Sequence, residues 1–79
     1  MLTVTVRHFA QLRERRGTNQ ETVEVADGCT LRELYQQLFP EEAASNLAVG
    51  CAMDHAVVPP DTRITEGAQV AFLPPIGGG

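Results

Sequence analysis

The sequence predicts an α+β fold, in which a mixed sheet of about five strands carries one main helix. Three observations support this prediction. Segments with alternating hydrophobic and polar residues recur near both ends of the chain, and one helical segment with a clear start signal lies between them. The chain has 79 residues, 43% of them hydrophobic and 20% charged, which is typical of one folded domain with a small core.

The first two strands of this sheet are predicted near the N-terminus. Residues 2–7 alternate Leu and Val with polar side chains, which indicates a strand with one buried face. A short helical turn around residues 9–12 follows, and Gly17 can close it in a left-handed conformation. After a loop at residues 18–20, residues 22–25 repeat the strand pattern. We therefore expect the first two strands to pair around the helical turn.

The main helix is predicted to begin at a capping box. Thr30 is followed three residues later by Glu33, a pairing that satisfies free backbone N–H groups at a helix start. The hydrophobic residues of 31–38 then share one face of a helix about ten residues long. Pro40 stops it. Residues 41–46 are expected to form a less regular, acidic connection.

The remaining strands are predicted in the C-terminal half. Residues 47–53 give a weak strand pattern that ends at a turn over residues 54–55, and residues 57–58 suggest a short strand. Ile64 is an isolated apolar anchor. Residues 69–73 form the last predicted strand, with two hydrophobic side chains on the core face. The order strand, strand, helix, strand, short strand, strand is the layout of a β-grasp domain.

Charge and cysteine content narrow the functional classes. A net charge of -4 argues against nucleic-acid binding, which depends on clustered cations. We interpret the one basic cluster, Arg13 to Arg16, as a solvated helix end, while an interface role for Arg13 stays open. Cys29 and Cys51 lack metal-site or redox spacing, so we expect two small hydrophobic side chains and no metal. No signal peptide or membrane span is visible, which favours the cytoplasm.

The last six residues differ in character from the rest. Pro74 and Pro75 end the last strand and prefer extended geometry, so residues 74–79 can reach roughly 20 Å. The glycines at 77–79 have no Cβ and can pass through a narrow channel. We therefore divide the chain into a domain, 1–73, and a flexible tail, 74–79. A frayed end is the alternative interpretation.

The tail carries an unreactive carboxylate that needs activation. An acyl-adenylate would allow a sulfur nucleophile to displace the phosphate side, leaving a thiocarboxylate. The chain has no phosphate-binding loop of the G-x-x-x-x-G-K-S/T type, so ATP would have to be used by a separate activating enzyme.

Three stretches resemble the MoaD/ThiS family of ubiquitin-like sulfur carriers. They are F-A-Q-L-R-E at 9–14 with Gly17, T-E-G at 65–67 with V-A-F at 70–72, and P-P-I-G-G-G at 74–79. The first and last are more similar to the branch formed by the small, sulfur-carrying subunits of molybdopterin synthase than to the thiamine branch. The likeness spans nearly the whole chain.

The resemblance implies a function and a set of site residues. Gly79 would be adenylated by an enzyme similar to ubiquitin-activating enzymes, converted to a thiocarboxylate, and inserted into the large synthase subunit, which holds the active site. Sulfur would then pass to cyclic pyranopterin monophosphate in molybdenum cofactor synthesis. Gly77 and Gly78 would thread the tail. Candidate partner contacts are Leu73, whose side chain should point away from the core, and Ile76, with Phe9 and Arg13 as weaker candidates. Ordinary packing or surface exposure is the alternative for each of the four. The chain itself is expected to bind no cofactor.

Other functions stay open at this point. The carrier could supply sulfur for thiamine or a modified nucleoside, or the chain could be a protein modifier joined through Gly79 to lysines of other proteins. All six basic residues are Arg, so the chain cannot form lysine-linked polymers of itself, which argues mildly against the modifier. A passive adaptor domain is the last alternative.

Overall fold

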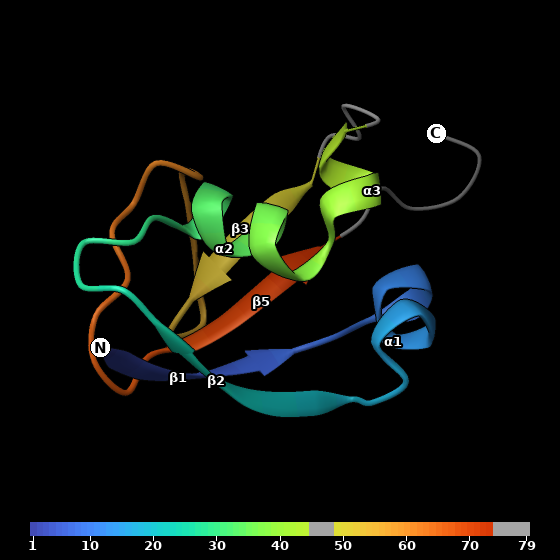
Figure 1. Ribbon diagram of the computed structural model, residues 1–79, viewed down its shortest axis with the longest axis horizontal. Coiled ribbons are helices and arrows are strands. Elements are labelled where there is room, and N and C mark those ends of the chain that lie inside the picture. The colour runs from blue at the N-terminus through green and yellow to red at the C-terminus, as the bar shows by residue number, and fades with distance from the viewer. Residues whose placement is uncertain (45–48, 74–79) are drawn as a thin grey trace.

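The computed structural model of the chain describes residues 1–44 and 49–73 and contains one five-stranded sheet (Figure 1). The strand order is β2-β1-β5-β3-β4; β1 and β5 are parallel and the other neighbouring strands are antiparallel. The predicted mixed sheet and the β1–β2 hairpin are thus confirmed. The strands are β1 Leu2–Arg7, β2 Gln20–Val25, β3 Gly50–Met53, β4 Ala56–Val58 and β5 Gln69–Leu73, and the helices are α1 Ala10–Arg16, α2 Leu31–Leu38 and α3 Pro40–Ala44.

The main helix, α2, begins at the predicted capping box. The Glu33 N–H donates to the Thr30 hydroxyl at 3.2 Å, and the Thr30 N–H donates to the Glu33 carboxylate at 2.8 Å. The helix buries one face, which consists of Leu31, Leu34, Tyr35 and Leu38. In Figure 1 it lies across one side of the sheet, together with α3.

The segment after α2 corrects the predicted irregular connection. Residues 40–44 form the helix α3, with Pro40 as its first residue. Proline is well suited to that position because a helix has no partner for its first N–H groups. It also disfavours helical geometry at Phe39, where α2 ends with ψ 64°. Pro40 therefore separates two helices, and residues 45–46 lie outside the described residues.

Other boundaries also differ from the predicted ones, and β4 begins at Ala56, one residue before the predicted short strand. The helical turn expected at residues 9–12 is the longer helix α1, which ends at Gly17 in the expected left-handed conformation, φ 74°. β2 begins at Gln20, because Gln20 and Glu21 pair with β1. β3 begins at Gly50, later than expected, while residues 47–48 lie outside the described part of the chain.

The core lies between the sheet and α2. Its aromatic centre is formed by Tyr35, Phe39 and Phe72, whose ring centroids lie 5.2 to 6.3 Å apart. Burying a side chain of this size contributes about 1.5–3 kcal/mol. Ile64 is 4% exposed, which confirms the predicted anchor. The core thus joins α2 to the middle of the sheet, and within the described residues no helix has the length and hydropathy to cross a bilayer.

The two cysteines are small apolar side chains, as predicted. Cys51 is buried on β3 and Cys29 is half-buried. Burial raises the pKa of both thiols, and Glu33 adds to the effect at Cys29. A raised pKa keeps a thiol protonated, and the protonated form is a poor nucleophile. Both cysteines therefore belong to the packing of the domain.

Candidate functional site

The sheet face opposite the helices carries the candidate site. Strand register places Arg7 beside Ala71, Ala71 beside Ala52, and Ala52 beside Val57. Side chains of paired residues point to the same side of a sheet, so these four form a row across four strands. Val6, Phe72 and Cys51, their chain neighbours, are buried on the helix side. The row therefore belongs to the outer face.

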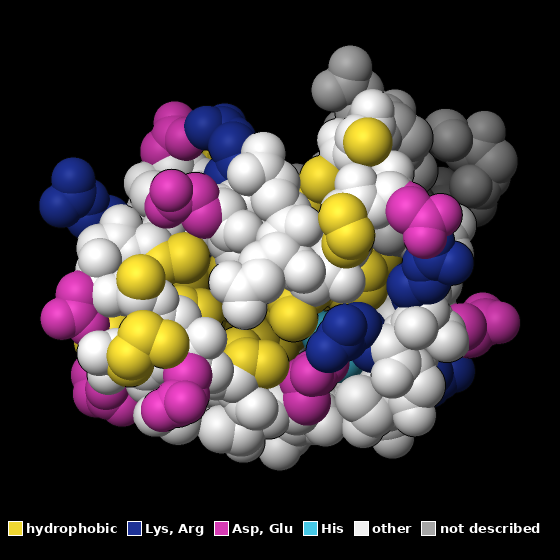
Figure 2. Space-filling view, viewed as in Figure 1, with side chains coloured by type: hydrophobic (Ala, Val, Ile, Leu, Met, Phe, Trp, Pro, Cys, Tyr) yellow, Lys and Arg dark blue, Asp and Glu magenta, His cyan; other side chains and the backbone are white. Residues whose placement is uncertain are grey.

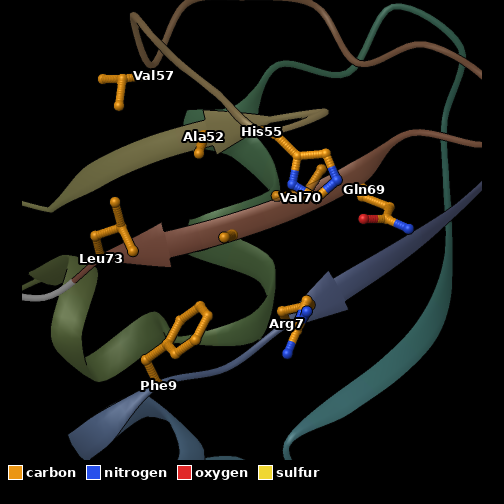
Figure 3. A pocket seen from close by; sticks show the side chains of 9 residues that line it. Arg7, Phe9, Ala52, His55, Val57, Gln69, Val70 and Leu73 are labelled. Carbon is orange, nitrogen blue, oxygen red and sulfur yellow. The ribbon is translucent and has the colours of Figure 1, made fainter.

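The row is hollow at its centre. Ala52 and Ala71 are small, whereas larger side chains stand around them, and the result is an open depression of about 310 Å³ (Figure 3). We call it the outer-face depression. Its lining residues are Arg7, Phe9, Ala52, His55, Val57, Gln69, Val70, Ala71 and Leu73.

The rim of the outer-face depression is apolar to an unusual degree for a surface. Val57 is 79% exposed, Phe9 40% and Leu73 39%. Exposed hydrophobic side chains that cluster around a concavity mark interaction sites more often than scattered ones do. The depression therefore has the properties of a protein-docking surface.

The charge of this surface differs from that of the whole chain. Arg7 and His55 line the depression, and no carboxylate does so among the described residues, although the net charge is -4. The Arg7 guanidinium lies 5.8 Å from the centroid of the Phe9 ring, in cation–π range. Phe9 thus holds Arg7 at the rim. The surface favours a partner with acidic groups around an apolar contact.

A tight turn places His55 at the edge of this surface. Asp54 and His55 connect β3 to β4, and both have positive φ, 51° and 71°. The turn is fixed to the neighbouring strand, because the Asp54 N–H donates to the Gln69 carbonyl at 2.8 Å. The Gln69 N–H in turn donates to Asp54 Oδ1 at 2.9 Å. The predicted turn at residues 54–55 is therefore confirmed.

The structure brings together two of the predicted partner contacts. Phe9 and Leu73 both line the outer-face depression, and the exposure of Leu73 agrees with the expected outward side chain. Arg13 is exposed on α1 and does not line it. Ile76 and residues 77–79 lie outside the described residues, so their roles remain predictions.

Sequence reasoning missed the other lining residues. Ala52, Ala71 and Val57 occupy outward positions of strands where polar residues are usual, and that signal was available in the alternation pattern. Arg7 and His55 gave no comparable signal. Within the described residues, no group of three or more His, Cys, Asp or Glu side chains is placed to hold a metal.

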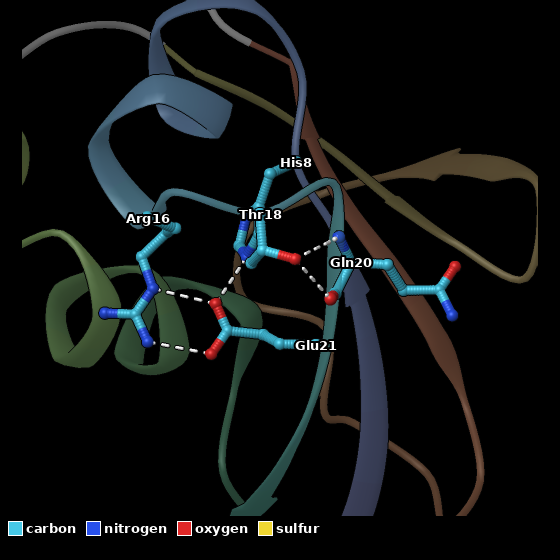
Figure 4. A network of polar contacts seen from close by, with 5 residues as sticks. All are labelled: His8, Arg16, Thr18, Gln20 and Glu21. Carbon is cyan, nitrogen blue, oxygen red and sulfur yellow. Dashed lines mark hydrogen bonds and ion pairs between the residues drawn. The ribbon is translucent and has the colours of Figure 1, made fainter.

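Two arginines of the basic cluster have structural roles. Arg16 donates to Glu21 through Nε at 2.7 Å and Nη2 at 2.8 Å (Figure 4). Arg15 forms an ion pair with Glu41. His8 Nε2 lies 2.6 Å from the same Glu21 carboxylate. On the helix-bearing face charges of both signs are spread around the margin (Figure 2). The predicted solvated helix end therefore fits these two arginines, and the structure adds an ion pair for each of them.

The hydrogen bonds to Glu21 change its titration. The Arg16 guanidinium lowers the pKa of Glu21 to about 2, with a further contribution from His8, while partial burial acts in the opposite direction. The carboxylate is thus ionised at neutral pH. It connects α1, the end of β1 and β2.

The element order, the mixed sheet and the packed helix define a ubiquitin-like β-grasp domain. The sequence model of the ThiS family matches residues 6–79. The chain therefore belongs to the ThiS family.

Two relatives are similar to the chain over its whole length. A protein of Escherichia coli (strain K12) named molybdopterin synthase sulfur carrier subunit is 35% identical, over 96% of this chain and 99% of its own. A protein of the same name from Mycobacterium tuberculosis (strain ATCC 25618 / H37Rv) is 32% identical, over 100% of both chains.

Solved structures agree in fold. A structure from Pyrococcus furiosus, described as a putative molybdopterin converting factor subunit 1, superposes with a TM-score of 0.79 at 23% identity and covers 96% of this chain and 100% of its own. The complex of subunits 1 and 2 of the molybdopterin-converting factor from Helicobacter pylori 26695 matches with a TM-score of 0.63 at 22% identity, over 99% of this chain and 100% of the other. At these identities the likeness supports the fold alone.

Proposed function

We propose that the chain is the sulfur carrier subunit of a molybdopterin synthase. This proposal rests on the full-length similarity to two proteins of that name, together with a family match that extends to Gly79. In this function Gly79 carries sulfur as a thiocarboxylate and donates it to cyclic pyranopterin monophosphate. The chain is then a non-catalytic subunit, and the active site belongs to the large subunit.

The proposed chemistry begins with activation of the Gly79 carboxylate. One carboxylate oxygen attacks the α-phosphorus of ATP, which gives the acyl-adenylate and releases pyrophosphate. A sulfur nucleophile then displaces AMP at the carbonyl carbon and leaves the thiocarboxylate. The sulfur then bonds to the pterin, and water hydrolyses the resulting acyl–sulfur bond, which restores the carboxylate. ATP and the sulfur donor are used by an adenylyltransferase, since this sequence has no phosphate-binding loop.

The outer-face depression is the proposed docking surface for the large subunit. Leu73 is both a lining residue and the last residue of β5, so the tail begins at the rim of the depression. A tail of six residues spans roughly 20 Å when extended. A subunit that covers the depression therefore lies within reach of Gly79. The subunit complex from Helicobacter pylori provides a precedent for such an assembly.

Intact mass spectrometry tests the proposed function. The chain is incubated with its host's adenylyltransferase, ATP and a sulfur donor, and replacement of one oxygen by sulfur adds about 16 mass units. The variant that lacks Gly79 is the matched control and should gain nothing. Addition of the large subunit and cyclic pyranopterin monophosphate should then return the mass to its starting value.

The same spectra distinguish other outcomes. An increase by the mass of a whole protein would favour a modifier. The thiocarboxylate could also persist in the presence of the large subunit and the pterin and be consumed only by another acceptor. That result would indicate a carrier that supplies sulfur for thiamine or a modified nucleoside. No mass change at all would contradict the carrier function.

A further inference from the structure

His55 occupies a backbone conformation that residues other than glycine adopt only in a small minority of cases. It is the second residue of the two-residue turn between β3 and β4, with φ 71°. Turns with two positive φ angles prefer Asn or Asp followed by Gly, because glycine has no Cβ to clash. Asp54 matches that preference at the first position, whereas a histidine at the second position is a conformational cost. Such a cost is often associated with a functional side chain.

The fold gains no hydrogen bond from the His55 side chain to offset this cost. Asp54 fixes the turn through its contact with the Gln69 N–H. For the His55 imidazole the structure shows no hydrogen bond or ion pair within residues 1–44 and 49–73. Instead the ring lies beside Val70 and Gln69 at the edge of the outer-face depression (Figure 3). The exposed imidazole therefore has free hydrogen-bonding capacity where we place the partner.

The chemistry of the surface indicates what the imidazole would contact. Two alanines form the floor of the outer-face depression, and Val57, Phe9 and Leu73 form its rim. Among the described residues, the only ionisable side chains that line the depression are Arg7 and His55. An imidazole N–H and a guanidinium both donate to carboxylates. The complementary partner surface has an apolar side chain beside acidic groups.

We propose that His55 is a specificity-determining residue of this docking surface. Its imidazole donates a hydrogen bond to a carboxylate of the large synthase subunit, whose neighbouring apolar side chain fills the outer-face depression. Arg7 attracts the same acidic surface. This inference rests on the proposed function, because it takes the large subunit as the occupant.

The test separates a binding role from a folding role. In H55G the imidazole is lost and the backbone strain is relieved. We expect its urea midpoint to rise by roughly 0.5 M. We also expect its dissociation constant for the host's large subunit, measured by calorimetry, to increase about tenfold. If His55 served only the fold, its replacement would not raise stability and weaken binding at the same time.

A substitution in the same turn provides the control. D54N keeps the oxygen that accepts from Gln69 and changes a side chain that does not line the depression. It should unfold at the wild-type urea midpoint or above and should bind at least as tightly as wild type. Equal binding by H55G and wild type would overturn the role of His55 and leave the proposed function intact. Failure of the wild-type chain to bind the large subunit would overturn both.

Discussion

At the scale of single residues, Glu21 connects a surface arginine to a buried histidine of the core. Its carboxylate accepts hydrogen bonds from Arg16 on α1 and lies 2.6 Å from His8 Nε2 at the end of β1. The His8 side chain is 0% exposed, and its ring packs edge-on against Phe39 at 5.6 Å. An ionised carboxylate can only accept, so Nε2 carries the shared proton. Glu21 thus fixes the orientation of a buried imidazole that contacts the core.

This network predicts an acid-dependent loss of stability. The pKa of Glu21 is lowered from 4.5 to about 2 in the folded chain, chiefly by Arg16. A lowered folded-state pKa contributes stability above the unfolded value, and that contribution disappears as the pH falls from 4.5 towards 2. We expect E21Q to lose roughly 1 kcal/mol at pH 7, since solvent screens the pair. Urea unfolding of wild type and E21Q between pH 7 and 2 measures this contribution and its pH dependence.

The control for this prediction is E14Q. Glu14 is exposed on α1, and within the described residues no hydrogen bond or ion pair is seen for it. Its substitution should leave stability within about 0.5 kcal/mol of wild type and preserve the acid transition. If E21Q kept the wild-type pH slope, the carboxylate would not be the group that couples protons to folding.

At the scale of elements, local signals predicted α2, β1 and β5 well. The capping box at Thr30 and the alternation in β1 act within a few neighbouring residues, so the sequence alone contains them. α3 was missed because Pro40 was interpreted only as a stop, although proline also suits the first position of a helix. The early start of β2 depends on pairing with β1, which is a tertiary effect.

The candidate site was less predictable than the elements. Phe9 and Leu73 were identified by resemblance and by outward position. The juxtaposition of Arg7, Ala71 and Ala52 depends on the parallel β1–β5 pairing and on β3 lying beside β5. Those pairings join residues far apart in the chain, and no local pattern specifies them. The unfavourable backbone at His55 is visible only in the structure.

The outer-face depression gives a prediction for the sheet as an element. A71L should fill the hollow and weaken binding of the large subunit about tenfold or more, because the partner's apolar side chain would meet an occupied space. Ala71 points away from the core, so unfolding should change by less than about 0.5 kcal/mol. Calorimetry and urea unfolding measure the two effects.

The matched variant for A71L is T22L. Thr22 is an exposed residue of β2 that pairs with Thr5 on the same outer face, and it does not line the depression. The T22L variant adds a similar apolar side chain elsewhere on the sheet, so it should bind the large subunit with wild-type affinity. Equal weakening by both variants would show that binding depends on general surface polarity and not on the hollow.

At the scale of the whole molecule, the two sheet faces have different tasks. The helix-bearing face supplies the core, while the opposite face offers an apolar hollow with Arg7 and His55 on an acidic chain. Leu73 connects this hollow to the start of the tail. In the proposed function, the partner is recognised on the sheet, and the chemistry takes place on a separate segment, residues 74–79. One small fold would then serve both docking and delivery of sulfur.

The division predicts the behaviour of tail deletions. The buried hydrophobic residues of the described core lie between Val4 and Phe72, so removal of residues 74–79 should leave the urea midpoint unchanged. Deletion of Gly79 alone should abolish thiocarboxylate formation in the mass assay. Both shortened chains should still bind the large subunit through the outer-face depression, with lower affinity for the longer deletion. Cooperative unfolding of the chain ending at Leu73 must persist, because a molten or unfolded product would contradict the separation of domain and tail.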